Sequence, residues 1–159
     1  MREILFKAKA INRDKGYHRT KYKNGDWVYG LVTRLYDERF ENLPAEMTNE
    51  NGVSGIEIDH NTICQCTGLK DKNGKLIWEN DIVRFQFDND DCPFPNKDIK
   101  KRIGKVFFSD FRASWSIAMG RNGSKCLNND LFKYVQNGNR VEIIGNKFDN
   151  PELIGEQNG

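Results

Sequence analysis

The sequence has few of the side chains on which most enzyme chemistry depends. It contains only two histidines, and neither has a nucleophile placed beside it in the sequence. No run of glycines has the spacing of a phosphate-binding loop. A base–thiol pair of His60 with Cys64 or Cys66 is a catalytic alternative, but such proximity in sequence more often reflects packing. We therefore expect a protein that is not an enzyme, with no catalytic residues and no cofactor.

The four cysteines lack the spacing of a metal site. Cys64 and Cys66 stand two residues apart in a strand-like run, so their side chains are expected to share one face. Cys92, Cys126 and the histidines are scattered without a finger or ribbon pattern. A zinc site is the weaker alternative, and we expect buried or incidental thiols and no bound metal.

Long hydrophobic runs are also missing. No apolar segment approaches the roughly 20 residues that a membrane-spanning helix needs. Residues 1–7 are interrupted by charge and lack the apolar centre of a signal peptide. We therefore expect a cytoplasmic protein with no membrane partner.

Aromatic residues and Asn-Gly pairs are the abundant signals. Ten Phe, five Tyr and three Trp can form a modest core without disulfides or a metal. Asn-Gly occurs at 24–25, 51–52, 73–74, 122–123 and 137–138, between runs rich in Val, Ile and aromatic residues. Short strands joined by such turns predict a mainly β, antiparallel fold.

We expect short strands joined mostly by tight turns. They are predicted at residues 4–11, 18–22, 27–36, 63–66, 76–78, 82–87, 104–108, 115–119 and 141–148. Asn73-Gly74 predicts a type I′ turn, and residues 79–81 are expected to form the next turn. Short helical turns are expected at residues 128–132 and 150–153.

Two stretches are expected to be irregular. Residues 41–55 are acidic and are broken by Pro44 and two glycines, which predicts a mobile loop between two halves of the chain. Residues 88–101 carry acidic residues, a Cys-Pro-Phe-Pro run and then bases, which predicts a long loop between two strands. A loop of this length is either functional or disordered.

The net charge is only +2, but the charges are unevenly placed along the chain. Residues 1–25 hold eight bases and two acids, whereas residues 37–59 hold one base and seven acids. These segments therefore carry net charges of +6 and −6. Such asymmetry suits an interaction surface, or faces of neighbouring copies that attract one another. Two solvated faces of one soluble domain are the plainer alternative.

Two groups of bases are candidate contacts for nucleic acid or another partner. In the first, bases alternate with aromatic residues, so phosphates and unpaired nucleobases could both be bound. The second group flanks the predicted long loop and also includes Lys97 and Lys105. The candidate contact residues are Arg13, Lys15, Tyr17, Arg19, Lys21, Tyr22, Lys23, Lys100, Lys101 and Arg102. The alternative is that the tyrosines pack across a hairpin and the bases only keep the protein soluble.

Self-association is a further hypothesis. Open sheets expose edge strands with which a second copy can pair, and the oppositely charged segments could lie opposite each other in neighbouring subunits. Trp27, Tyr29 and Trp78 are candidates for an apolar contact, although burial in the core is favoured for each. We therefore expect a homo-oligomer.

One stretch carries a resemblance to a known family. Residues 65–75 read Gln-Cys-Thr-Gly-Leu-Lys-Asp-Lys-Asn-Gly-Lys, and residues 77–83 read Ile-Trp-Glu-Asn-Asp-Ile-Val. This run resembles the signature of the phage-associated YopX family. Residues 141–153 match a second part of the pattern, and residues 25–30 and 6–9 match it more weakly, in the same order along the chain.

Three positions depart from that pattern. Cys64 and Cys66 stand where the family commonly has Gly and Tyr, and Asn80 stands where Gly is common. Because Asn tolerates a left-handed backbone, the turn at Asn80 is expected to survive.

The resemblance implies a fold rather than an activity. It implies an N-terminal β subdomain at residues 1–62, which contains the acidic loop, an SH3-like β-barrel at 63–155 and a tail at 156–159. It also implies a prophage or mobile-element protein in the cytoplasm of a bacterial host, with phage or host proteins as possible partners. The family supplies no catalytic residues to carry over. We therefore expect a self-associating, non-enzymatic binding module for protein or nucleic acid.

Overall fold

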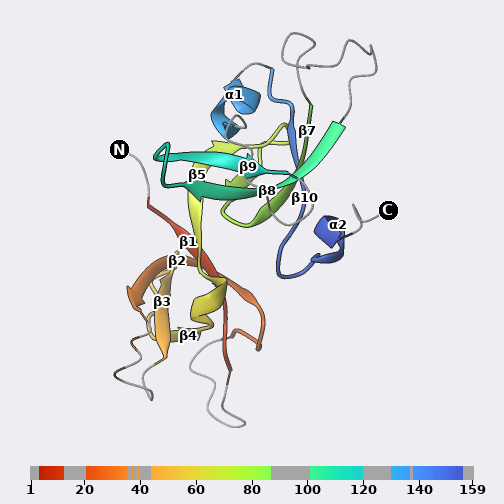
Figure 1. Ribbon diagram of the computed structural model, residues 1–159. Coiled ribbons are helices and arrows are strands. Elements are labelled where there is room, and N and C mark those ends of the chain that lie inside the picture. The colour runs from red at the N-terminus through yellow and green to blue at the C-terminus, as the bar shows by residue number, and fades with distance from the viewer. Residues whose placement is uncertain are drawn as a thin grey trace, which may run out of the picture. The chain divides into compact units, whose positions relative to one another are not determined.

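The computed structural model is mainly β, with antiparallel sheets and few helices (Figure 1). It describes residues 4–12, 21–35, 37, 39, 44–86, 101–119, 130–136 and 138–155. The chain forms two compact units, residues 1–66 (unit 1) and residues 67–159 (unit 2). The prediction of a mainly β, antiparallel fold is confirmed.

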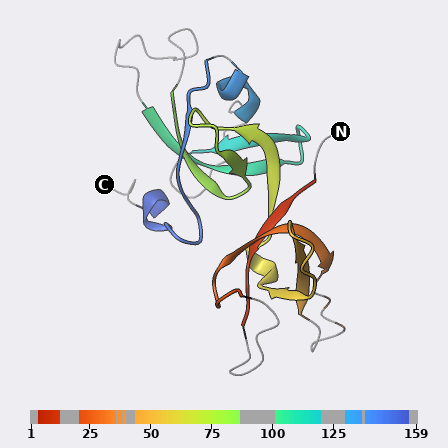
Figure 2. The ribbon, with the colours of Figure 1, turned by 180° about the vertical axis from the view of Figure 1, so that it is seen from behind.

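Unit 1 is an antiparallel sheet, seen from both sides in Figures 1 and 2. Its strands, in the spatial order β4-β3-β2-β1, are β1 (Phe6–Lys9), β2 (Trp27–Arg34), β3 (Ala45–Asn49) and β4 (Ile56–Ile58). The first residues of β5 (Cys64–Lys70) pair with β1, and a 3-10 turn, η2 (His60–Thr62), precedes β5.

The core of unit 1 lies on one side of this sheet. Ala8 lies opposite Val28, and Met47 lies between Val32 and Ile56 on neighbouring strands. Ala8, Val28, Met47 and Ile56 are each at most 2% exposed. Because side chains alternate along a strand, the residues between them point to the other side of the sheet, here called the outer face.

Strand β3 shows that the prediction of a mobile loop over residues 41–55 was wrong for its middle part. Ala45, Met47 and Asn49 are buried, whereas Glu46 and Thr48 between them are half-buried, which is the period of a strand. These residues have weak strand propensity, so composition alone favoured a loop. Pairing with β2 on one side and β4 on the other fixes the strand.

Unit 2 is built around a four-stranded antiparallel sheet in the order β10-β7-β8-β9, and β6 pairs with β5. The elements are β6 (Leu76–Trp78), β7 (Asp81–Gln86), β8 (Lys101–Ser109), β9 (Ser114–Ala118), α1 (Leu131–Gln136), β10 (Val141–Asn146) and α2 (Glu152–Gly155). Within the described residues of unit 2 the strand pairings form no closed barrel, so this part of the SH3-like expectation is not seen.

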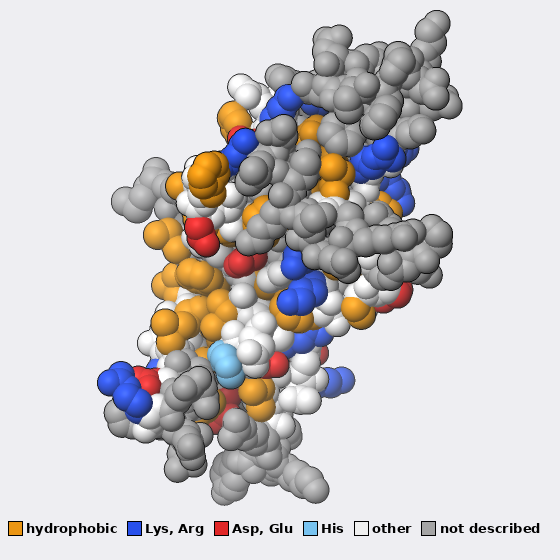
Figure 3. Space-filling view, viewed as in Figure 1, with side chains coloured by type: hydrophobic (Ala, Val, Ile, Leu, Met, Phe, Trp, Pro, Cys, Tyr) orange, Lys and Arg blue, Asp and Glu red, His pale blue; other side chains and the backbone are white. Residues whose placement is uncertain are grey.

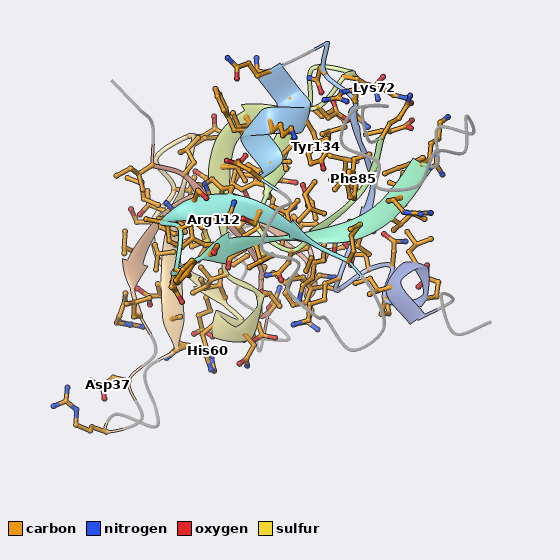
Figure 4. The ribbon with its side chains drawn as sticks, turned by 45° about the horizontal axis from the view of Figure 1, so that its top comes forward. Asp37, His60, Lys72, Phe85, Arg112 and Tyr134 are labelled. Atoms are coloured by element: carbon orange, nitrogen blue, oxygen red, sulfur yellow. The ribbon has the colours of Figure 1, made fainter. Side chains whose placement is uncertain are left out.

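The core of unit 2 lies between one face of this sheet and α1. Phe85 and Tyr134, both labelled in Figure 4, pack edge to face with their ring centroids 4.9 Å apart. Leu131 of α1 and Ile117 of β9 are fully buried in the same cluster. The two predicted helical turns at residues 128–132 and 150–153 correspond to the start of α1 and of α2.

The turn between β5 and β6 differs from the predicted type I′ turn. Such a turn needs a positive φ at both central residues, but only Gly74, at 80°, has one, and Asn73 does not. Gly74 N donates to Asp71 O at 2.9 Å, as in a type I turn followed by a left-handed glycine. The carboxylate of Asp71 favours this form, because its Oδ1 accepts from the amides of Asn73 and Lys75.

The next turn behaves as the sequence predicted. Asn80 has a φ of 65°, so it occupies the left-handed region in place of a glycine. Its amide donates to Val106 O at 2.9 Å, and its carbonyl accepts from Lys147 N at 2.9 Å. The turn is therefore bonded to the interior of β8 and to the residue that follows the end of β10.

Several predictions lie wholly or partly outside the described residues. Of the strand predicted at 18–22 only residues 21 and 22 are described, and they are not in a strand. Of the predicted loop at 88–101 only Lys101 is described, and it begins β8. In the part of the chain that the structure covers, no helix combines the length and the apolar character needed to span a membrane.

Candidate functional site

The buried carboxylate of Asp71 lies in the turn of the hairpin formed by β5 and β6. It is 2% exposed, and its Oδ2 accepts from Ile143 N of β10 at 3.1 Å, in addition to the two turn amides bound by Oδ1. Burial opposes its ionisation, but the amides of Ile143, Lys75 and Asn73 together keep the Asp71 pKa below its ordinary value. Its role is structural, since it ties the turn to β10.

The first predicted group of contact residues is only partly described. Arg13, Lys15, Tyr17 and Arg19 lie outside the described residues, as does Lys100 of the second group. Lys21 and Lys23 are exposed, as a phosphate contact requires. Tyr22 packs against the core of unit 1, and its hydroxyl accepts from Asn49 Nδ2 at 3.1 Å. Tyr22 therefore supports the alternative that this tyrosine serves packing.

The two described members of the second group point to opposite faces of β8. Lys101 lies opposite Gln86, whereas Arg102 lies opposite Phe85, whose side chain is in the core. Residues opposite each other in an antiparallel pair share a face, so only Lys101 lies on the face away from that core. Lys105, from the same predicted group, lies on the Lys101 side because it is four residues further along the strand.

Register brings further charges to this side of the unit 2 sheet. Arg84 of β7 lies opposite Glu142 of β10, and Arg84 Nη1 is 3.3 Å from Glu142 Oε2. Lys72 of the hairpin reaches the same oxygen, with Nζ 2.9 Å away. We call Lys72, Arg84, Lys101, Lys105 and Glu142 the basic face.

The charges of the basic face act on one another. The hydrogen bond from Lys72, together with the positive charges of Lys72, Arg84 and Lys101, holds the pKa of Glu142 below its ordinary value against the effect of desolvation. The basic face contains four bases and one acid, so it carries a net charge of +3. The side chains of Lys72 and Arg84 remain 44% and 41% exposed. Figure 3 shows Lys and Arg side chains at the surface around the start of β8.

The outer face of unit 1 carries a second surface. Trp27, Tyr29 and Leu31 alternate along β2 away from the core, and we call them the apolar stripe. Tyr29 is 41% exposed and Leu31 is 53% exposed. Figure 3 shows hydrophobic side chains exposed on the side where β2 lies. The sequence favoured core burial for the three aromatic candidates, which is right for Trp78, at 7% exposed, and wrong for Tyr29.

Lysines of β1 lie beside the apolar stripe. Lys9 is opposite Trp27 and Lys7 is opposite Tyr29, so both lysines are on the outer face. Their Nζ atoms lie 5.3 Å and 4.9 Å from the centroid of the Trp27 ring, within the range of a cation–π interaction. Lys7 is only 6% exposed, whereas Lys9 is half-buried.

The residues of the thiol–imidazole alternative differ in their exposure. Cys64 and Cys66 are buried free thiols, and Cys64 Sγ donates to Thr62 O at 3.3 Å. His60, labelled in Figure 4, is exposed on η2. Within the described ranges no three His, Cys, Asp or Glu side chains gather in a way that could hold a metal ion.

Comparisons with known proteins found a matching family and a similar solved structure. A family model described as "YopX protein" matches residues 20–155. Among solved structures, the crystal structure of protein EF1440 from Enterococcus faecalis is similar, with 23% sequence identity and a TM-score of 0.49, covering 96% of this chain and 98% of that one. No curated protein matches the chain.

Proposed function

The chain belongs to the YopX protein family, and we propose that it is a non-enzymatic binding module whose basic face on unit 2 binds the phosphate backbone of nucleic acid. The observation that carries this proposal is the convergence of Lys72 and Arg84 on Glu142, with Lys101 close enough to lower the pKa of the same carboxyl. One carboxylate holds two cationic side chains in place on this face of the sheet. Phosphate contacts from lysine and arginine supply most non-specific affinity for nucleic acid.

The arrangement suits a phosphate backbone because the bases are held by strands. Arg84 and Lys101 project from adjacent strands of one sheet, and Lys72 projects from a turn that is bonded to β10 through Lys72 N and Val141 O at 2.8 Å. Side chains positioned in this way lose less freedom when they bind than bases on a loose segment. The half-buried Phe107, on the same side of β8 as Lys101 and Lys105, adds an aromatic group.

Fluorescence anisotropy tests the proposal. Labelled single-stranded DNA, duplex DNA and RNA are titrated with protein freed of co-purified nucleic acid, at low and moderate salt. We expect saturable binding. A plot of the logarithm of the binding constant against the logarithm of the salt concentration should have a slope of about −0.7 to −0.9 for each phosphate contact. Flat titrations at protein concentrations on the order of tens of micromolar would exclude nucleic acid and leave a protein partner.

Two charge-matched double variants locate the site. Arg84→Glu with Lys101→Glu alters the basic face, and Lys21→Glu with Lys23→Glu alters the predicted N-terminal contacts by the same total charge. We expect the first pair to weaken binding at least about tenfold and to lower the salt slope by about two phosphate contacts. A larger effect of the second pair would place the site on the N-terminal bases instead. Circular dichroism melting curves check that both variants fold.

We also propose that the protein self-associates and acts in the cytoplasm of a bacterial host as a phage-associated protein, in keeping with the family resemblance. Oppositely charged segments and an exposed apolar stripe support self-association. The antiparallel sheet of unit 2 supports a relationship to SH3-like domains in an open form.

A further inference from the structure

Two cations of the basic face converge on one oxygen atom. Lys72 Nζ lies 2.9 Å and Arg84 Nη1 lies 3.3 Å from Glu142 Oε2. An ammonium and a guanidinium group that meet at one oxygen are also the groups with which proteins hold a phosphate oxygen. The Glu142 carboxylate therefore occupies a place between Lys72 and Arg84 that suits a phosphate group.

The backbone, rather than Glu142, sets the positions of both bases. Lys72 N donates to Val141 O at 2.8 Å, and the carboxylate of the preceding Asp71 accepts from Ile143 N at 3.1 Å. Arg84 lies within β7, which pairs with β8 on one side and with β10 on the other. Removal of the Glu142 carboxylate would therefore leave both backbone positions unchanged.

The carboxylate of Glu142 competes with a phosphate for these two cations. The hydrogen bond from Lys72 and the nearby positive charges hold the Glu142 pKa below its ordinary value, so the group is ionised at neutral pH. Its side chain is 28% exposed, so it can turn into solvent without opening the core. A phosphate that enters must replace this carboxylate, because two anions held by the same cations would repel each other.

Tethering decides which anions can replace Glu142. A group attached to the chain has an effective concentration on the order of millimolar or more, so a free phosphate ion competes poorly with it. In a nucleic-acid strand, a phosphate bound at Lys101 tethers the neighbouring phosphates in the same way. Lys101 lies opposite Gln86, two residues along β7 from Arg84. At about 3.4 Å per residue and about 4.8 Å between strands, the Cα atoms of Lys101 and Arg84 are about 8 Å apart. A strand held at Lys101 therefore brings a phosphate to Arg84.

We propose that Lys72 and Arg84 form a phosphate subsite that Glu142 closes in the free protein, and that a polynucleotide displaces the carboxylate whereas a single phosphate ion does not. This inference rests on the proposed nucleic-acid binding and names the ligand of that site as a polymer of phosphates. Glu142 makes a second contact, at Lys101, the condition for binding at the pair.

Glu142→Gln opens the subsite, because the amide keeps the shape of the side chain and removes its charge. Each phosphate contact makes the binding constant about five to eight times larger at 0.1 M salt than at 1 M. We expect Glu142→Gln to bind a short labelled single-stranded DNA tighter than wild type by about this factor at 0.1 M salt. Glu46→Gln is the matched control, because the Glu46 side chain is 27% exposed and bonds Arg34 at 2.6 Å in unit 1. It should change the affinity by less than about twofold.

Two charge-matched backgrounds separate closure of the subsite from general repulsion of the DNA. Arg84→Gln removes a cation that contacts Glu142, whereas Lys101→Gln removes one that acts on Glu142 through its charge. We expect the gain from Glu142→Gln to persist in the Lys101→Gln background and to fall to about threefold or less in the Arg84→Gln background. Equal gains in the two backgrounds would overturn the subsite.

Inorganic phosphate tests the requirement for a polymer. Release of the labelled DNA by sodium phosphate is compared with its release by sodium chloride at the same ionic strength. The two salts should act alike on wild type, whereas phosphate should release the DNA from Glu142→Gln at a concentration at least about twofold lower than chloride does. A wild type that phosphate inhibits as strongly as the variant would overturn the polymer requirement.

The outcomes separate this inference from the proposed function. If neither wild type nor Glu142→Gln binds DNA, the proposed function fails and the inference fails with it. If wild type binds and Glu142→Gln binds no tighter, the inference alone fails and Glu142 only positions the two bases. Circular dichroism melting curves check that each variant folds. Glu142→Asp, which draws the carboxylate back by one methylene, is the second variant, with a smaller gain expected in the same direction.

Discussion

Replacing Asp71 by asparagine tests whether its buried carboxylate holds the hairpin to β10. In the wild type, Oδ1 accepts from Asn73 N and Lys75 N at 2.9 and 3.0 Å, and Oδ2 accepts from Ile143 N at 3.1 Å. The side-chain carbonyl of asparagine can replace only one of these oxygens. If it keeps the two turn bonds, its amide group faces the Ile143 amide, and two donors then oppose each other.

The expected cost follows from that geometry. A hydrogen bond to a charged group is worth about 1.5 to 3 kcal/mol, and a buried donor without an acceptor costs about 1 to 3 kcal/mol. We therefore expect Asp71→Asn to lower the free energy of unfolding at pH 7 by about 2 to 4 kcal/mol. Asp110→Asn, at an exposed aspartate of the β8–β9 turn, is the matched control and should change it by less than about 0.5 kcal/mol.

The pH dependence of this difference follows from the lowered pKa of Asp71. A carboxyl whose pKa is lower in the folded state contributes stability that is fully present above the pKa of about 3.9 that it has when unfolded. That contribution is lost as the pH falls through the lower folded value. The difference between wild type and Asp71→Asn should therefore be constant from pH 5 to 8 and shrink below about pH 4.

Urea unfolding followed by tryptophan fluorescence measures both effects. Trp78 and Trp115 both belong to unit 2, so they report on the part of the chain that contains Asp71. Denaturation curves are collected for wild type and for both variants between pH 3 and pH 8. A loss below about 0.5 kcal/mol at pH 7, or a difference that does not shrink in acid, would refute the role assigned to the carboxylate.

Two predictions, each measured by urea unfolding, concern Gly104 in the unit 2 sheet, with Gly52 of unit 1 as its control, and the left-handed turn at Asn80. Gly104→Ala should lower the free energy of unfolding by about 1 to 3 kcal/mol, because the added Cβ would overlap Ile117 Cγ2 and lie 2.7 Å from Ala118 O. Gly52 has open space around it, so Gly52→Ala should lower the free energy of unfolding by only about 1 kcal/mol, the cost of the positive φ. Equal losses at both sites would contradict the overlap. Asn80→Gly should be nearly neutral and Asn80→Ala should cost about 1 kcal/mol, since Asn80 has a φ of 65°; a reversed order would contradict the left-handed turn.

Local sequence chemistry predicted those parts of the fold that neighbouring residues determine. The apolar run at residues 76–78 became β6 at the same bounds, and the tolerance of Asn for a left-handed backbone placed Asn80 correctly. Strand β3 could not be predicted in this way, because its residues are weak strand formers and only pairing with β2 and β4 fixes them. The type I′ turn predicted from Asn73-Gly74 was wrong for a related reason, since the side chain of Asp71, rather than the dipeptide, determines the turn type.

The candidate surfaces depend on register, which local patterns do not contain. The sequence placed Lys101 and Arg102 in one group, yet a strand sends adjacent residues to opposite faces. Arg84 and Glu142 lie far apart in sequence and meet only because β7 and β10 pair with these residues opposite each other. Alternation along β2 separates Tyr29 from the core in the same way, and a correct strand assignment with its partner register would have been needed to see it.

The hairpin that identifies the family also shapes the basic face. Lys72 N donates to Val141 O, and Asp71 Oδ2 accepts from Ile143 N, so the turn is bonded to β10 at the residues on either side of Glu142. Glu142 is thereby fixed within 2.9 Å of Lys72 Nζ, and its strand register sets it opposite Arg84. Asp71 consequently acts as a positioning residue for charges that it does not contact. The hairpin of the family signature therefore arranges the surface proposed to bind nucleic acid. Within this hairpin, only the side chain of Lys72 belongs to that surface.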